Sequence, residues 1–169
     1  EATARAQLEK AWHSGLPLLA HHQKFDSVVA MKHWGLRQQP WQNLHDTLFL
    51  AYLADPHSRA IGLKELAADL LNWPADEKDA LIEWVITNQK FLLARYPYNN
   101  PIDPKTGKPK PTITPKIAWA WIWTAPGELA GRYAEGDTDR TLALFQDLYP
   151  LIHEHGMGYA YDTERELMP

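Results

Sequence analysis

The sequence predicts a mostly helical chain with one short buried strand near its N-terminus. Apolar residues recur at spacings of three and four along several segments, which is typical of amphipathic helices. The short apolar run at residues 18–21 is instead typical of a buried strand. Hydrophobic residues make up 45% of the 169 residues, which is enough for a core. We therefore expect one globular domain, or one domain and the start of another.

Turn-forming and capping residues separate the predicted elements. Gly15 and Pro17 end the first helix, and Gly35 is expected to cap the second. Asn43 or Asp46 is expected to cap the third, because short polar side chains accept hydrogen bonds from the first free N–H groups of a helix. The predicted helices span residues 3–13, 25–34, 44–53, 63–71, 76–91 and 126–155, and a further element begins at 161.

Residues 96–115 are expected to form a long extended loop, since six prolines exclude a regular helix or strand there. Lys105, Lys108 and Lys110 in this loop could follow a DNA backbone, or they could be solvated surface residues. Three tryptophans alternate in the following run, residues 117–123. They could stack against bases, or they could belong to the core.

Composition limits the possible classes of function. The net charge of −4 and the pI near 6.1 give no overall basic signature for nucleic acid, although a metal-dependent nuclease site is itself acidic. The absence of cysteine excludes disulfides and thiolate metal sites, and fits a reducing compartment. No apolar stretch is long enough to cross a bilayer and there is no signal peptide, so we expect a cytoplasmic protein without a membrane partner.

Two acidic motifs lie about a hundred residues apart. Asp26 closely follows the predicted strand, whereas Tyr133 and Asp137 lie one turn apart on one face of a predicted helix. Carboxylates that converge in this way could hold two metal ions for phosphodiester hydrolysis, with the tyrosine orienting water. Asp26 could instead stabilise the start of a helix through the helix dipole. The Tyr133–Asp137 pair could equally be a surface feature.

The adjacent pair His45 and Asp46 permits a second interpretation. Such a pair binds metal in a helical class of phosphohydrolases, which also needs further histidines upstream. His13, His21 and His22 are available, but their spacing to His45 does not favour this class. Asp46 as a helix cap is the simpler interpretation.

Three stretches, in order, resemble the 3′–5′ proofreading exonuclease domain of family A DNA polymerases, particularly the bacteriophage type. Residues 20–26, Ala-His-His-Gln-Lys-Phe-Asp, are similar to the second exonuclease motif. Residues 46–56 and the Leu-Lys-Glu-Leu-Ala block at 63–67 are similar to the segment that follows it. Residues 133–139, Tyr-Ala-Glu-Gly-Asp-Thr-Asp, are similar to the third motif in its tyrosine subtype. Residues 161–169 resemble the beginning of the polymerase region.

This resemblance implies an α/β chain with a ribonuclease H-like exonuclease fold over residues 1–157 and the start of a linker to a C-terminal polymerase domain over 158–169. Mg²⁺ or Mn²⁺ would be the cofactor, held by Asp26 and Asp137, and Tyr133 would orient the attacking water. The substrate would be the 3′ end of single-stranded DNA in a bacterial host cell. The residues expected to contact DNA are His22, Phe25, Lys105, Lys108 and Lys110.

The sequence departs from the family pattern at two points. His22 occupies the usual Asn position of the second motif. The first motif, an Asp-x-Glu pair on the first strand, does not precede Asp26. The resemblance therefore implies an N-terminally truncated fold whose first strands are missing, which is mostly helical and cleaves little by itself. A non-catalytic scaffold or DNA-binding module is the alternative.

Overall fold

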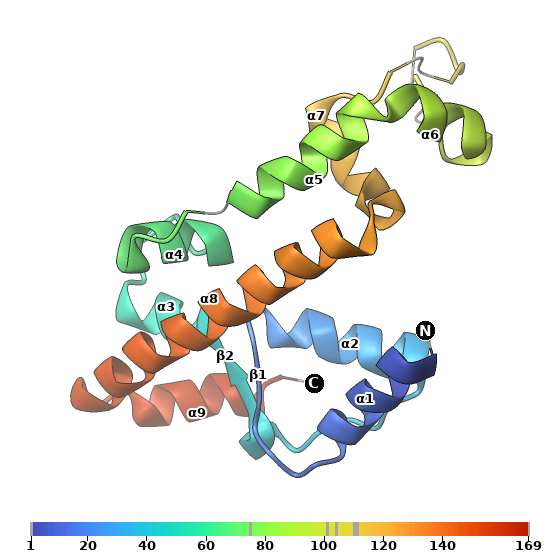
Figure 1. Cartoon of the computed structure of the whole chain (residues 1–169). Helices are drawn as coiled ribbons and strands as arrows, with labels where there is room; N and C mark the ends of the chain where they lie inside the picture. The colour runs from blue at the N-terminus through green and yellow to red at the C-terminus, as the bar shows by residue number, and fades with distance from the viewer. Residues whose placement is uncertain (1, 75, 101, 104, 110–111, 169) are drawn as a thin grey trace. The chain divides into compact units, whose positions relative to one another are not determined.

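The computed structural model describes residues 2–74, 76–100, 102–103, 105–109 and 112–168, and within them the chain is mostly helical with two short strands (Figure 1). It divides into two compact units. Unit 1 comprises Glu1–Pro74 and Thr138–Pro169, and unit 2 comprises Ala75–Asp137. The mostly helical α/β character predicted from the sequence is confirmed.

Unit 1 contains a parallel pair of strands with helices on either side of it in the sequence. β1 and β2 are in register from Leu18 opposite Leu44 to Ala20 opposite Asp46. The elements that lie wholly in unit 1 are α1 (Ala2–Trp12), β1 (Leu18–Ala20), α2 (Gln23–Trp34), η1 (Trp41–Asn43), β2 (Leu44–Asp46), α3 (Thr47–Ala54), α4 (Leu63–Leu71) and α9 (Gly158–Glu166).

Unit 2 is built from short helices around its own small core. Its elements are α5 (Asp76–Thr87), α6 (Gln89–Arg95), η2 (Pro97–Asn99), α7 (Pro115–Ala118) and η3 (Trp119–Thr124). The 28-residue helix α8 (Gly127–Glu154) begins in unit 2 and ends in unit 1. Val85, Leu92 and Trp121 are each at most 1% exposed and form the centre of this core.

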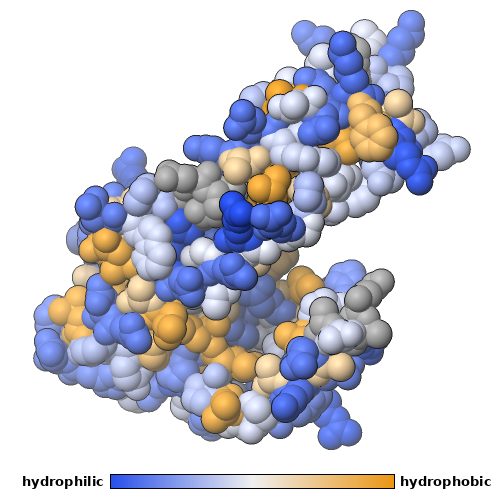
Figure 2. All heavy atoms as spheres, viewed as in Figure 1, coloured by the Kyte–Doolittle hydropathy of each residue, from blue (hydrophilic) through white to orange (hydrophobic). Residues whose placement is uncertain are grey.

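The main core of unit 1 lies among α3, α4, α8 and α9. Leu50, Leu144, Ile152 and Tyr161 are at most 1% exposed and belong to one apolar cluster. Hydrophobic side chains also reach the surface over α3, α4 and the end of α8 (Figure 2). A smaller cluster around Trp12 packs α1 near α2. α9 is thus an integral part of unit 1, because the ring of Tyr161 completes its core.

The structure corrects two predicted elements. Residues 44–46, predicted to begin a helix, form β2, because their backbone groups pair with β1 rather than with the next helical turn. The helix predicted at 76–91 is divided in two at Asn88, whose Nδ2 donates to the carbonyl oxygen of Trp84 at 2.8 Å. The other predicted helices have counterparts with ends shifted by a few residues.

The loop and the tryptophan run are more ordered than the sequence suggests. Residues 96–115 include the turn η2 and a bridge between Ile102 and Pro109. The three tryptophans lie on the 3-10 helix η3, and they differ in exposure. Trp121 is 1% exposed in the core, whereas Trp123 is 56% exposed.

Candidate functional site

The carboxyl ends of the two parallel strands form the candidate site. β1 and β2 end level with each other, at Ala20 and Asp46. α2 begins three residues after β1, and α3 begins directly after β2. The first turns of both helices therefore meet at one edge of the sheet, where helix N-termini favour negative charge.

Asp46 holds this edge together. It is fully buried and caps α3 by accepting a hydrogen bond from the N–H of Leu48 at 2.9 Å. Its carboxylate also accepts from the N–H groups of His22 at 2.9 Å and Gln23 at 2.8 Å, at the start of α2. The predicted capping role of Asp46 is confirmed, and both carboxylate oxygens are engaged with backbone donors.

His22 has an unusual backbone conformation that its neighbours require. Its φ of 72° and ψ of 50° are left-handed, and this turn directs its N–H towards Asp46. Asn and His tolerate this conformation better than most residues. The structure therefore gives a physical reason why His22 can occupy a position where the resembled motif has Asn.

The rings of His22 and Phe25 form an exposed pair beside the edge. Their centroids are 6.3 Å apart and their planes differ by 14°, so the rings are stacked. Phe25 is 62% exposed although it is a large apolar residue. Both side chains are thus accessible to a ligand, as a DNA-contacting role would require.

Asp26 lies in the first turn of α2 with an accessible carboxylate. It has no hydrogen-bond or ion-pair partner among the described residues. Partial burial raises the pKa of the Asp26 carboxyl, the nearby Asp46 carboxylate raises it further, and His22 opposes the shift. A bound cation would relieve this repulsion, so the chemistry of Asp26 fits a metal ligand.

His21 turns inward while His22 faces solvent. The Nδ1 atom of His21 lies 2.9 Å from the hydroxyl oxygen of the buried Thr47. This contact links the end of β1 to the start of α3.

His45 lies in an aromatic cluster rather than in an open metal site. Its ring lies 5.0 Å from Phe145, 5.7 Å from Tyr149 and 6.1 Å from Tyr161, centroid to centroid. Burial and then the positive charge of Arg165 lower the pKa of His45 to about 4. His45 is therefore neutral at physiological pH.

The hydroxyl of Tyr161 connects His45 to the strand edge. It accepts from the N–H of Asp46 at 3.1 Å and lies 3.2 Å from Nδ1 of His45. Because its oxygen is already an acceptor, the hydroxyl hydrogen can be donated to neutral His45. Burial raises the pKa of Tyr161, which keeps this hydrogen in place.

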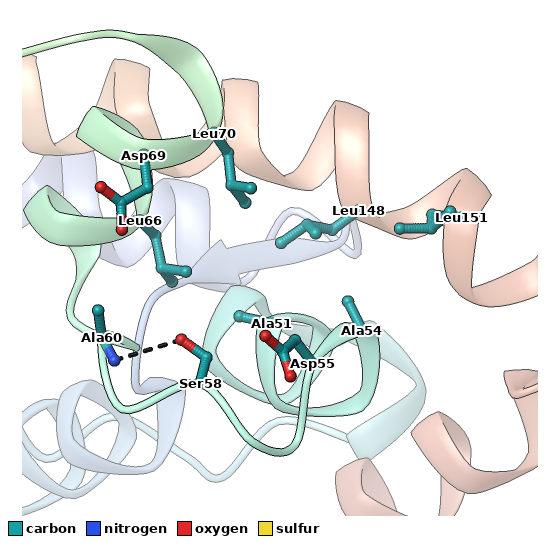
Figure 3. A pocket seen from close by; sticks show the side chains of 10 residues that line it. All are labelled: Ala51, Ala54, Asp55, Ser58, Ala60, Leu66, Asp69, Leu70, Leu148 and Leu151. Atoms are coloured by element: carbon teal, nitrogen blue, oxygen red, sulfur yellow. Dashed lines mark hydrogen bonds between the residues drawn. The ribbon is translucent and has the colours of Figure 1, made fainter.

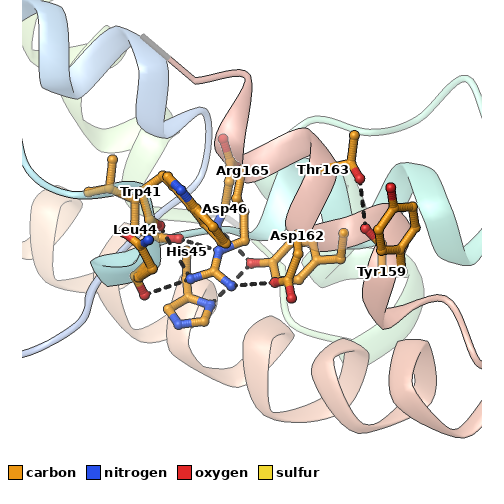
Figure 4. Close-up of polar contacts among 10 residues, drawn as sticks. Trp41, Leu44, His45, Asp46, Tyr159, Asp162, Thr163 and Arg165 are labelled. Atoms are coloured by element: carbon orange, nitrogen blue, oxygen red, sulfur yellow. Dashed lines mark hydrogen bonds and ion pairs between the residues drawn. The ribbon is translucent and has the colours of Figure 1, made fainter.

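Arg165 anchors α9 to β2 and η1 (Figure 4). Its Nε donates to the carbonyl oxygen of Leu44 at 2.6 Å, and Nη2 donates to that of Gln42 at 2.7 Å. Nη1 pairs with Asp162 at 2.8 Å. No local pattern in the sequence marks Tyr161 or Arg165 as functional, because the groups on β2 and η1 that they contact lie more than a hundred residues away.

Tyr133 and Asp137 both lie on α8, one turn apart, as predicted. Both are half-buried, and the ring of Tyr133 lies 5.9 Å from that of Trp119. They belong to unit 2, whereas Asp26 belongs to unit 1. The convergence of Asp26 and Asp137 on one substrate stays a prediction.

Two of the three lysines of the predicted DNA-binding loop lie among the described residues. Lys105 and Lys108 are exposed on the turn that follows Asp103, whose carboxylate accepts from the N–H of Lys105 at 2.8 Å. Lys110 lies outside the described residues. In the described part of the chain, no group of three or more His, Asp or Glu side chains is close enough to hold a metal ion.

A separate apolar pocket of about 330 Å³ lies in unit 1 (Figure 3). Leu66 and Leu148 line it from α4 and α8, and Asp55 and Asp69 add carboxylates. Asp55 also accepts a hydrogen bond from the N–H of His57 at 3.0 Å. No local pattern in the sequence predicts this pocket, because its walls come from segments far apart in the chain.

Comparisons with family models, curated proteins and solved structures found no match to this chain. None of the helices in the described residues has the length and apolar character needed to cross a membrane. The case for a function therefore depends on the residues and their geometry.

Proposed function

We propose that this chain is part of a 3′–5′ exonuclease that removes nucleotides from the 3′ end of single-stranded DNA, within a family A DNA polymerase. The accessible Asp26 carboxylate at the carboxyl edge of the parallel strands is the observation that carries the proposal. Ligand sites in open α/β sheets lie at this edge. A ribonuclease H-like fold, of which this pair would be one part, accounts for the position of Asp26.

The proposed roles follow from the chemistry of each side chain. Asp26 and Asp137 would hold Mg²⁺ or Mn²⁺, and Tyr133 would orient the attacking water. The cations would supply positive charge to stabilise the attacking and leaving oxygens of an in-line displacement. The exposed pair of His22 and Phe25 offers stacking surface beside Asp26 for the terminal bases.

A non-catalytic DNA-binding module is the second candidate. Its support is the presence of His22 where the resembled motif has Asn. Such a module would bind DNA at the same edge without hydrolysing it.

The phosphohydrolase that uses the His45–Asp46 pair has less support. Both oxygens of Asp46 accept backbone N–H groups, and Nδ1 of His45 faces Tyr161. A metal at this pair would have to displace the contacts that hold the strand edge.

Paramagnetic broadening of NMR signals by Mn²⁺ tests the proposed metal site, because it detects even weak binding. We expect the amide signals near Asp26 and those near Asp137 to broaden together at low Mn²⁺ concentration. Asp26→Asn should reduce broadening at both positions, because the two carboxylates would share the site. Asp69→Asn is the matched control, since Asp69 is an exposed carboxylate elsewhere in unit 1.

Broadening confined to the Asp55–Asp69 pocket, or unchanged at Asp137 in Asp26→Asn, would contradict a shared site. A shared site without DNA cleavage in the natural polypeptide would favour the non-catalytic module.

A further inference from the structure

Unit 2 carries a basic segment on an otherwise acidic chain. Residues 88–125 contain six lysines and arginines and one acidic residue, whereas the whole chain has a net charge of −4. Lys90, Arg95, Lys105 and Lys108 are exposed within this segment. The charge of this surface therefore suits an anionic partner.

The same segment exposes large aromatic rings. Phe91 is 63% exposed, Tyr98 is 99% exposed and Trp123 is 56% exposed. Exposing large apolar rings to water costs free energy, and these three rings do not contribute to the buried core. Their exposure is therefore a property of the surface of this segment. Hydrophobic and hydrophilic side chains lie side by side over α6 (Figure 2).

Four residues of the segment, which we call the aromatic row, are related by helix position or by ring contacts: Phe91, Arg95, Tyr96 and Trp123. Phe91 and Arg95 lie four residues apart on α6, on one face of the helix. The guanidinium carbon of Arg95 lies 5.6 Å from the centre of the Tyr96 ring. Tyr96 in turn contacts Trp123 edge-on, with centroids 4.9 Å apart.

The charge of Arg95 is available to a ligand. Within the described residues it contacts the Tyr96 ring, and no described carboxylate pairs with it. A guanidinium held over an aromatic ring can also bind a phosphate.

We propose that the aromatic row and the exposed lysines of the same segment bind single-stranded DNA independently of metal, as a second strand-binding surface separate from the Asp26 edge. Bases would stack on Phe91 and Trp123, and phosphates would meet Arg95, Lys105 and Lys108. The aromatic row and the exposed lysines are the evidence for the surface itself. The choice of DNA over RNA rests on the proposed function.

The arrangement favours a nucleic acid over a lipid surface. Helices that lie on membranes present a continuous apolar face, usually over several turns. α6 has seven residues, and its exposed Phe91 lies between the exposed cations Lys90 and Arg95. Rings interspersed with cations suit the bases and phosphates of a single strand.

Fluorescence anisotropy with labelled oligothymidylate of about 12 nucleotides, in EDTA, tests this proposal. We expect the unmodified chain to bind and Trp123→Ala to weaken binding roughly tenfold, as loss of one stacked base predicts. Trp123→Phe should restore most of the affinity, because the ring is kept. Tyr159→Ala is the matched control, since Tyr159 is 86% exposed in unit 1.

Salt dependence separates the phosphate contacts from stacking. Joint replacement of Lys105 and Lys108 by Ala should reduce the slope of log affinity against log salt by about 1.4, whereas Lys10→Ala should not. The proposal is overturned if the chain does not bind, if Trp123→Ala and Tyr159→Ala behave alike, or if oligouridylate binds more tightly. Binding to phosphatidylserine vesicles but not to DNA would also overturn it.

These outcomes are distinct from those of the nuclease proposal. Metal-free binding that is lost in Trp123→Ala would stand even if no cleavage is found. Cleavage that is unaffected by Trp123→Ala would leave the nuclease proposal intact and remove the second surface.

Discussion

The hydroxyl of Tyr161 is a single group that connects two elements of unit 1. It accepts the N–H of Asp46 and contacts His45, so it links α9 to the end of β2. The tyrosine lies in the C-terminal segment that the sequence suggested as a linker. No periodicity could have identified its partners, which lie over 110 residues earlier.

Tyr161→Phe should lower the free energy of unfolding by about 1–3 kcal/mol, because it leaves the buried N–H of Asp46 without an acceptor. Urea denaturation followed by circular dichroism measures this change. Tyr159→Phe removes an exposed hydroxyl from the same helix and should leave stability unchanged. Equal effects of the two substitutions would contradict the role given to Tyr161.

His45 should make the free energy of unfolding depend on pH in the acidic range. Its pKa is about 4 in the folded chain against an ordinary value of 6.5. Between these values the unfolded chain binds a proton that the folded chain does not, so stability falls as pH drops from 6.5 towards 4.

Replacing His45 with Gln should remove about 1–2 kcal/mol of this pH dependence, because solvent screens part of the shift at a half-buried side chain. Denaturation midpoints at neutral pH and near pH 4 give the comparison. His33→Gln, on an exposed position of α2, is the control and should keep the full dependence. An unchanged pH profile in His45→Gln would show that His45 is not the responsible group.

At the scale of the element, Asp46 explains why the two strands end together. A single carboxylate caps α3 and also holds the first turn of α2. The sequence predicted the capping role from residue type and position. It could not predict the contacts with His22 and Gln23, because these depend on the parallel pairing of β1 with β2.

Asp46→Ala should destabilise the chain by about 2–4 kcal/mol, since three backbone N–H groups lose their acceptor. Hydrogen exchange of the amides of His22, Gln23 and Leu48 should accelerate, and this readout locates the effect. Asp69→Ala removes an exposed carboxylate and should change neither quantity. Protection that persists at His22 and Gln23 would contradict the linking role of Asp46.

Local patterns predicted the helices better than the strands. α4 has the bounds predicted for it and is capped by Asn72. Its prediction succeeds because the apolar spacing that indicates the helix lies within nine residues. β2 has three residues and exists only through its pairing with β1, so an apolar run there resembled the start of a helix. The alternating tryptophans left two interpretations open, since a 3-10 helix places alternate residues on different sides and only tertiary packing decides which side is buried.

At the scale of the molecule, the candidate residues fall into two units. The sequence identified Asp26, Tyr133 and Asp137 through motif order, which does not depend on how the units pack. It did not predict the aromatic row of unit 2 or the pocket of unit 1, because both are assembled by tertiary contacts. A common function for the two units is the central claim to be tested.

Trimming of 5′-labelled single-stranded DNA by the natural polypeptide that contains this chain, with Mg²⁺ or Mn²⁺, tests that claim most directly. The account predicts products shortened stepwise from the 3′ end. Activity should fall by at least about a hundredfold in Asp26→Ala and in Asp137→Ala, as loss of a metal ligand implies. Asp69→Ala should retain full activity. An absence of trimming, or trimming that survives both substitutions, would contradict the proposed exonuclease.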